Sequence, residues 1–173
     1  MDLVILRRDG VVNQKGKKGI YSPEDWHPIP GSLEAIARLN HAGYKVAIAT
    51  EQPGLITREL DLERLNAIHA RFHQLLSRVG GHVDAIFICP HGPDESMDCK
   101  EARPGLYQNI CERFFLSTLG VPVISDDVGD LQAAKAIGGK PILVGATEEE
   151  TDTEFPGYDD LSHAVEHLLT HSP

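Results

Sequence analysis

The sequence predicts an α/β fold, in which a central parallel sheet of about five strands is covered on both faces by helices. Two observations lead to this prediction. Short, apolar, β-rich segments alternate along the chain with longer segments of helical periodicity. The chain of 173 residues suits one domain with a sizeable core, and no segment has the composition of a linker. We therefore expect residues 1–173 to form a single domain.

The predicted strands are short runs of largely apolar residues bounded by turn-forming or polar residues. They are Leu3–Leu6, Lys45–Ala49, Ala85–Cys89, Pro122–Ser125 and Pro141–Val144. Since helical segments separate them, we expect the strands to be parallel, with their carboxyl ends at one edge of the sheet.

The helical segments carry start signals or apolar residues at helical spacing. Ser32 follows Pro30-Gly31 and is a plausible N-cap, and Pro104 suits a first helical turn. The predicted helices are Ser32–Ala42, Leu60–Val79, Pro104–Leu116, Gly129–Ile137 and Asp160–Thr170.

Two longer excursions leave this regular alternation, and neither is large enough to be a cap domain. Residues 13–30 are polar and are expected to form a surface lobe beside the strand ends, with Trp26 packing it onto the body. Residues 89–104 form the second excursion and contain two of the three cysteines.

Composition and charge exclude several classes of partner. The formal net charge of −10 argues against nucleic acid or an anionic membrane, because both require a basic face. No apolar run is long enough to span a bilayer, and the N-terminus lacks a basic region and a small-residue cleavage site. We therefore expect a cytoplasmic monomer, in which cysteines are buried or bind metal rather than form a disulfide framework.

Polar residues follow three of the predicted strands. In parallel sheets, ligands bind at the carboxyl ends of the strands, near the point where the strand order reverses. Residues Arg7–Asp9, Thr50–Gln52 and Asp126–Asp130 are therefore expected to meet at one mouth.

Four segments together resemble a known family. They are Leu6-Arg7-Arg8-Asp9-Gly10-Val11-Val12-Asn13, Thr50-Glu51-Gln52-Pro53-Gly54, Cys89-Pro90-His91-Gly92-Pro93 continuing to Met97–Gly105, and Ser125-Asp126-Asp127-Val128-Gly129-Asp130. In this order they resemble the haloacid dehalogenase (HAD) superfamily, and more narrowly its D-glycero-D-manno-heptose-1,7-bisphosphate phosphatase branch, which is related to histidinol phosphatase. The resemblance covers nearly the whole chain. It implies a HAD-like Rossmannoid three-layer sandwich without a large cap domain, acting on a phosphorylated sugar.

The first motif departs from the family pattern at the residue that performs the chemistry. The resemblance implies a pair of aspartates, of which the first attacks phosphorus and binds Mg²⁺ and the second serves as general acid and base. Asp9 matches the second position, whereas Arg7 stands at the first. A guanidinium stays protonated and offers no nucleophilic lone pair. We therefore expect phosphatase activity to be lost.

Other phosphate-binding positions are changed as well. The resemblance assigns substrate contacts to Thr50, Gln52 and Lys100, while Glu101 stands where the family has a phosphate-binding lysine. Arg7 stands where the family has an aspartate, and Glu101 stands where it has a lysine. We therefore hypothesise an Arg7–Glu101 ion pair, with Asp9 and Asp126 near Arg7. The alternative is that the two substitutions arose independently, at a site whose function is no longer maintained.

The resemblance also implies two metals. Asp9, Asp126, Asp127 and Asp130 match the Mg²⁺ site, but Arg7 at roughly 4 Å would repel the ion by about 8 kcal/mol at an effective dielectric constant of about 20. A millimolar Mg²⁺ site contributes only about 4 kcal/mol, so we expect weak or absent binding. The alternative role of these aspartates is to cap a helix N-terminus.

A structural Zn²⁺ would be held by Cys89, His91 and Cys99, with Met97 in place of the third ligand in chain order. This set is incomplete, and a loop held by packing alone is the alternative. Cys111 is expected in the core, and His69 and His73 on an exposed helix face.

Three functions remain open. The first is a relative of the heptose bisphosphate phosphatases that has kept the fold and lost the reaction. The second is a module that binds a phosphosugar without cleaving it, through Thr50, Lys100 and Arg7. The third is a working phosphatase, as in the lipopolysaccharide heptose pathway, with Asp2, Asp9 or Asp126 as a substitute nucleophile. The first function includes a regulatory or binding role toward another protein, whose identity the sequence leaves open.

Overall fold

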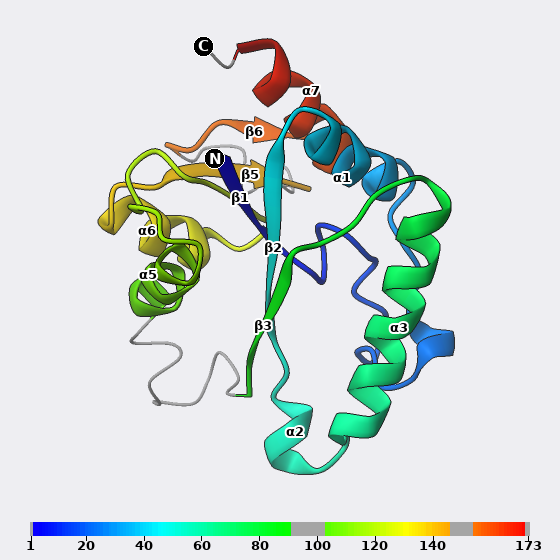
Figure 1. Cartoon of the computed structure of the whole chain (residues 1–173). Helices are drawn as coiled ribbons and strands as arrows, with labels where there is room; N and C mark the ends of the chain where they lie inside the picture. Colours follow the sequence, from blue (N-terminus) through cyan, green and yellow to red (C-terminus); the bar gives the residue numbers. More distant parts are fainter. Residues whose placement is uncertain (1, 91–102, 146–153, 172–173) are drawn as a thin grey trace.

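A computed structural model describes residues 2–90, 103–145 and 154–171. Its centre is a six-stranded, entirely parallel sheet in the order β3-β2-β1-β4-β5-β6. The strands are β1 (Asp2–Arg7), β2 (Tyr44–Glu51), β3 (Ala85–Cys89), β4 (Pro122–Ser125), β5 (Lys140–Val144) and β6 (Gly157–Tyr158). The strand order reverses at β1, which lies between β2 and β4 (Figure 1).

Helices cover both faces of this sheet, as the alternating sequence pattern predicted. They are α1 (Ser32–His41), α2 (Gly54–Thr57), α3 (Leu62–Arg78), α5 (Arg103–Arg113), α6 (Val128–Ala136) and α7 (Leu161–His171), with a short 3₁₀ turn η1 (Pro23–Asp25). Helices α1, α3 and α7 lie on one face, and α5 and α6 lie on the other (Figure 1). The molecule is therefore the three-layer sandwich that the sequence predicted.

Alternation along β1 builds the two cores. Val4 and Leu6 point into the core beneath α1, α3 and α7, whereas Leu3 and Ile5 point into the core beneath α5 and α6. All four side chains are at most 2% exposed. Because β1 is covered on both faces, the residue at its carboxyl end, Arg7, has a fixed position in the fold.

Three details differ from the sequence-based expectation. The sheet has a sixth strand, β6, which is only two residues long and therefore has no detectable periodicity. The sequence also did not predict α2 and η1, because they are too short to show periodicity. The N-cap of α1 is Gly31, at φ +84°, rather than Ser32, whose hydroxyl donates instead to the carbonyl of Val12 at 2.6 Å.

The segment from Asn13 to Pro30 is joined to the body through Trp26. Its indole is fully buried and packs on Phe72 of α3, with ring centroids 5.1 Å apart. Arg71 Nε, also from α3, donates to the carbonyl oxygen of Trp26 at 3.1 Å. Trp26 therefore packs this segment onto the body, as expected.

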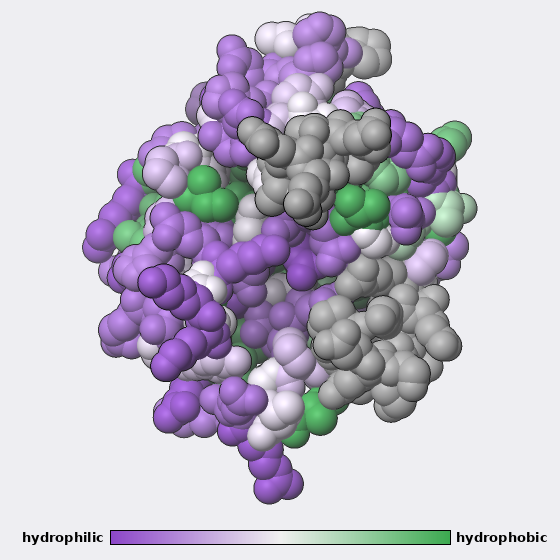
Figure 2. All heavy atoms as spheres, turned by 180° about the vertical axis from the view of Figure 1, so that it is seen from behind, coloured by the Kyte–Doolittle hydropathy of each residue, from purple (hydrophilic) through white to green (hydrophobic). Residues whose placement is uncertain are grey.

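The face of the molecule seen in Figure 2 is mostly hydrophilic. On the face seen in Figure 2, hydrophobic residues form small separate groups among hydrophilic ones. Within the described part of the chain, no helix combines the length and apolar character needed to cross a membrane.

We expect Trp26→Ala to lower the free energy of unfolding by about 3–5 kcal/mol, because it leaves a cavity against Phe72 in a close-packed core. Urea denaturation followed by circular dichroism would measure the loss. Phe115→Ala is the matched control, since the Phe115 side chain is 96% exposed and its removal should change stability little. Equal effects of the two substitutions would contradict the packing role of Trp26.

Candidate active site at the carboxyl edge of the sheet

The carboxyl ends of three adjacent strands bring one cation and several carboxylates together. Arg7 ends β1, Glu51 ends β2 and Asp126 follows β4. Arg7 Nη2 lies 3.9 Å from Glu51 Oε2, and Arg7 Nε lies 3.6 Å from Asp126 Oδ1. The mouth predicted from the strand order is therefore present, with Arg7 inside it.

The start of α6 adds two further carboxylates. Arg7 Nη1 donates to Asp130 Oδ2 at 2.7 Å and lies 3.6 Å from Asp127 Oδ2. Asp127 is also the N-cap of α6, where its side chain accepts from the backbone N–H groups of Gly129 and Asp130. The helix-capping alternative is thus correct for Asp127, whereas the Asp130 side chain accepts a hydrogen bond from Arg7.

Ser125 joins this network through its side chain. Its hydroxyl donates to Asp130 Oδ2 at 2.8 Å and accepts from the backbone N–H of Asp127 at 3.0 Å. Both Ser125 and Asp130 are buried. The hydroxyl therefore holds Asp130 in place for Arg7, a role for which the sequence carried no signal.

The surrounding acids keep Arg7 charged. Burial lowers the pKa of Arg7. The charge and hydrogen bond of Asp130, together with the charges of Glu51 and Asp126, raise it by more, so the net shift is upward. The side chain is only 20% exposed, which strengthens these attractions relative to a surface pair. Arg7 is therefore a permanent cation within the cluster.

A second cation, Lys15, reaches the cluster from the segment that follows the first motif. Lys15 Nζ lies 2.6 Å from Asp126 Oδ2. The contact requires Gly10, because a Cβ at that position would overlap the Asp126 carboxylate and lie 2.7 Å from Lys15 Cε. Sequence reasoning missed Lys15, although a run of three lysines in four residues, Lys15-Gly16-Lys17-Lys18, was a visible signal.

Asp9 belongs to a separate hydrogen-bond network. Its Oδ1 accepts from Arg8 Nε at 2.8 Å and from Asn13 Nδ2 at 3.0 Å. Arg8 is fully buried, and its Nη1 lies 3.1 Å from Nε2 of His69 on α3. The expectation that His69 lies on an exposed helix face is wrong, because its ring is turned toward Arg8 and only 7% of the residue is exposed.

Burial lowers the pKa of His69 to about 4, and the positive charge of Arg8 and a contribution from His73 act in the same direction. The ring is therefore neutral at pH 7, and Nε2 accepts the Arg8 N–H. Sequence reasoning did not predict the Arg8–His69 contact, because a buried Arg–His pair joining two distant segments has no local signature.

Two of the predicted substrate-contacting residues are turned toward each other. Gln52 Nε2 donates to Thr50 Oγ1 at 2.8 Å, and both side chains are buried. The backbone N–H of Gln52 donates to the carbonyl of Cys89 at 2.7 Å. These groups stabilise the ends of β2 and β3.

The residues present do not fit a divalent cation while Arg7 is among them. Within residues 2–90, 103–145 and 154–171, no group of three or more His, Cys, Asp or Glu side chains is arranged to hold a metal. A cation at the centre of the cluster would lie against the guanidinium and experience the repulsion of about 8 kcal/mol estimated at 4 Å.

Several predicted site residues lie outside the described residues, namely His91, Met97, Cys99, Lys100 and Glu101, so the Arg7–Glu101 pair stays a hypothesis. Cys89 is buried at the end of β3, but it is disulfide-bonded rather than the thiol or zinc thiolate that we expected. A sulfur engaged in a disulfide is not a thiolate ligand for Zn²⁺. Cys111 is a buried free cysteine in α5, as predicted.

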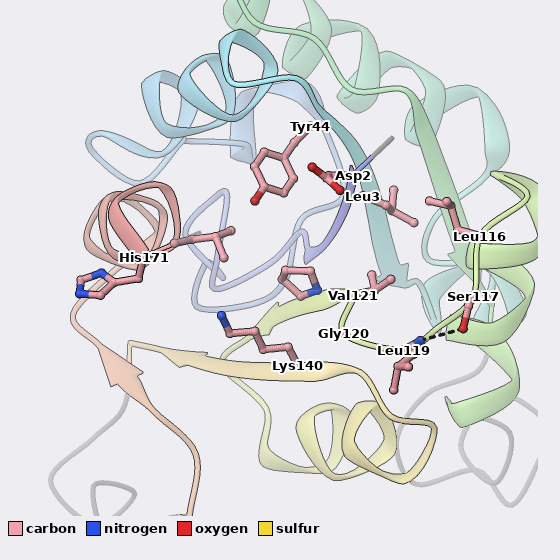
Figure 3. A pocket seen from close by; sticks show the side chains of 12 residues that line it. Asp2, Leu3, Tyr44, Leu116, Ser117, Leu119, Gly120, Val121, Lys140 and His171 are labelled. Atoms are coloured by element: carbon pink, nitrogen blue, oxygen red, sulfur yellow. Dashed lines mark hydrogen bonds between the residues drawn. The ribbon is translucent and has the colours of Figure 1, made fainter. Parts of the chain in front are cut away.

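A cavity of about 460 Å³ lies elsewhere on the molecule. Its lining includes Asp2, Tyr44, Pro122 and Lys140, which are the first residues of β1, β2, β4 and β5. Figure 3 shows Tyr44 and Lys140 extending into it, with His171 of α7 at its edge. It therefore lies at the amino edge of the sheet, opposite the carboxylate cluster.

Comparison with known proteins gives several similarities. The D-glycero-beta-D-manno-heptose-1,7-bisphosphate 7-phosphatase of Bordetella bronchiseptica is 49% identical over 144 residues, covering 83% of this chain and 80% of that protein. The Pseudomonas putida protein of the same name is 42% identical over 175 residues, covering 98% and 100%. No family model matches the chain.

A solved structure is similar over the whole length. The crystal structure of D,D-heptose 1,7-bisphosphate phosphatase from B. bronchiseptica, complexed with magnesium and phosphate, is 42% identical. It superposes with a TM-score of 0.91, covering 99% of this chain and 100% of that chain.

We expect millimolar Mg²⁺ to leave the thermal unfolding of the unmodified protein unchanged, because Arg7 repels the ion. In Arg7→Asn, four carboxylates lose their shared cation, and stability should fall by about 2–4 kcal/mol, less than for a fully buried pair. Added Mg²⁺ should then restore stability to this variant. Differential scanning fluorimetry with and without 10 mM MgCl₂ measures both effects, and Mg²⁺ stabilising the unmodified protein equally would contradict the repulsion.

We expect His69 to make the protein less stable at acidic pH. Between pH 6.5 and about 4 the unfolded chain binds a proton at this position and the folded chain does not, so stability is lost as the pH falls through that window. The loss between pH 7 and pH 4.5 should be on the order of 2–3 kcal/mol smaller in His69→Gln than in the unmodified protein. Urea denaturation at the two pH values tests this, with His73→Gln as the control that should retain the loss.

Proposed function

The chain belongs to the D-glycero-beta-D-manno-heptose-1,7-bisphosphate 7-phosphatase family of the HAD superfamily, and on this premise we propose that it has kept the family fold and lost phosphoryl transfer. Its carboxylate cluster is paired with the protein's own Arg7 at the place where the family would hold a metal ion.

One observation carries this proposal. The Arg7 guanidinium donates to Asp130 at 2.7 Å and lies within 4 Å of Glu51, Asp126 and Asp127, at the end of the central strand. Phosphate monoesters hydrolyse extremely slowly without catalysis, so a nucleophile in line with phosphorus is needed. A protonated guanidinium supplies none. Here it also occupies the position at which a metal ion would have to bind.

The carboxylates considered as substitutes are engaged or misplaced. Asp2 begins β1, five residues before Arg7, and is therefore roughly 16 Å away along an extended strand. Asp126 is paired with Lys15 and Arg7. Asp9 is held by Arg8 and Asn13, and moving it into line would leave the acid/base position empty.

An active phosphatase is nevertheless the direct alternative, because the relatives carry that name. Binding of a phosphosugar without cleavage is less favoured by the geometry. Thr50 and Gln52 bind each other, and four carboxylates face the two cations Arg7 and Lys15. A phosphate dianion entering this cluster would be repelled.

The decisive assay is release of phosphate from D-glycero-D-manno-heptose 1,7-bisphosphate in the presence of Mg²⁺. We expect the unmodified protein to give only the background rate. Arg7→Asp should restore turnover, and Arg7→Asp with Glu101→Lys should raise it further, because the nucleophile and the phosphate-binding lysine are both returned. Arg7→Asn is the matched control, since it removes the cation without supplying a nucleophile.

Turnover by the unmodified protein that disappears in Asp9→Asn would overturn the proposal. A folded double variant with no turnover would show that Arg7 is not the cause of the missing phosphatase activity. That result would also overturn the proposal.

A further inference from the structure

A buried polar network links helix α3 to the first motif. It runs from His69 through Arg8 to Asp9, over distances of 3.1 Å and 2.8 Å. Arg8 is 0% exposed, which is exceptional for a residue that always carries a charge. A charge kept at that depth requires fixed partners, and the network supplies them.

The shape of a guanidinium explains why both partners are needed. Its N–H groups lie in one plane in a rigid fork, so one hydrogen bond leaves the plane able to turn about that contact. Arg8 donates through Nε to Asp9 and through Nη1 to His69, and the two contacts together fix the plane. Arg8 Nη2 is buried without a hydrogen-bond partner, so it contributes no third restraint.

Asp9 is held on one side only. Its Oδ1 accepts from both Arg8 and Asn13, whereas Oδ2 has no hydrogen-bond partner within the described residues. The side chain is 27% exposed. One carboxylate oxygen is thus fixed and the other is available for proton transfer, which is the arrangement an acid/base residue requires.

We propose that His69 is a positioning residue, which holds the carboxylate of Asp9 in the acid/base orientation by fixing Arg8. The assignment of the acid/base position to Asp9 rests on the proposed function. His69 does not touch the reacting atoms and acts only through Arg8. The acid/base half of the site is therefore still assembled, although the nucleophile position is occupied by Arg7.

Two substitutions separate this role from simple core filling. His69→Gln keeps an acceptor for Arg8 Nη1, whereas His69→Leu keeps an apolar side chain and removes the acceptor. His73→Leu is the matched control, because His73 lies one turn further along α3, is exposed and stacks on Phe72.

Hydrogen exchange of the Arg8 Nε–H group, followed by ¹⁵N NMR in the natural chain, reports the Arg8–Asp9 contact directly. We expect exchange to be about tenfold faster or more in folded His69→Leu, from loss of a hydrogen bond to a charged group, and nearly unchanged in His69→Gln and His73→Leu. Unchanged protection of this group in folded His69→Leu would overturn the proposal.

A second readout uses the Arg7→Asp, Glu101→Lys background. There we expect His69→Leu to lower kcat about tenfold or more with little change in KM, and His69→Gln to recover most of the loss. A KM effect alone would contradict a positioning role. If that background shows no turnover, the proposed function fails, while the exchange measurement still decides the role of His69.

Discussion

The guanidinium of Arg7 holds the carboxyl edge of this sheet together. Four carboxylates, from the end of β2, the end of β4 and the first turn of α6, converge on one point. Two carboxylates about 4 Å apart repel each other by about 4 kcal/mol at an effective dielectric constant of about 20, so such a cluster requires a cation. Arg7 is that cation, and it is covalently part of the central strand. Its position is fixed because β1 is covered by helices on both faces.

The exchange of aspartate for arginine changes the local charge by two units, which is the charge that Mg²⁺ would bring. A similar protein of the same fold has been crystallised with magnesium and phosphate. In this chain, Arg7 and Lys15 supply two positive charges from the protein itself, and Gly10 allows Lys15 to approach Asp126. The carboxylates at this edge are therefore paired with cations that belong to the protein itself.

The contacts around Asp9 are of a different kind. Asp9 is oriented by Arg8 and Asn13, and Arg8 in turn by His69 from α3, so this half depends on buried hydrogen bonds rather than on the carboxylate cluster. The two networks are joined through the backbone of the first motif, where Arg7, Arg8 and Asp9 are consecutive. Arg7 makes none of the side-chain contacts that orient Asp9, and the second network is in place beside it.

The sequence by itself determined the α/β architecture, the parallel sheet and the meeting of Arg7 with the residues after β2 and β4, because these depend on hydrophobic periodicity and strand polarity. The motifs also identified the family, and they led to the prediction that Arg7 stands in place of its nucleophile. Only the tertiary structure showed that Ser125 holds Asp130, that Lys15 reaches Asp126 and that His69 is buried against Arg8. These contacts join residues from different elements, and His69 lies 61 positions from Arg8. No local pattern encodes such pairs, since they depend on how the elements pack and on where charge is excluded from water.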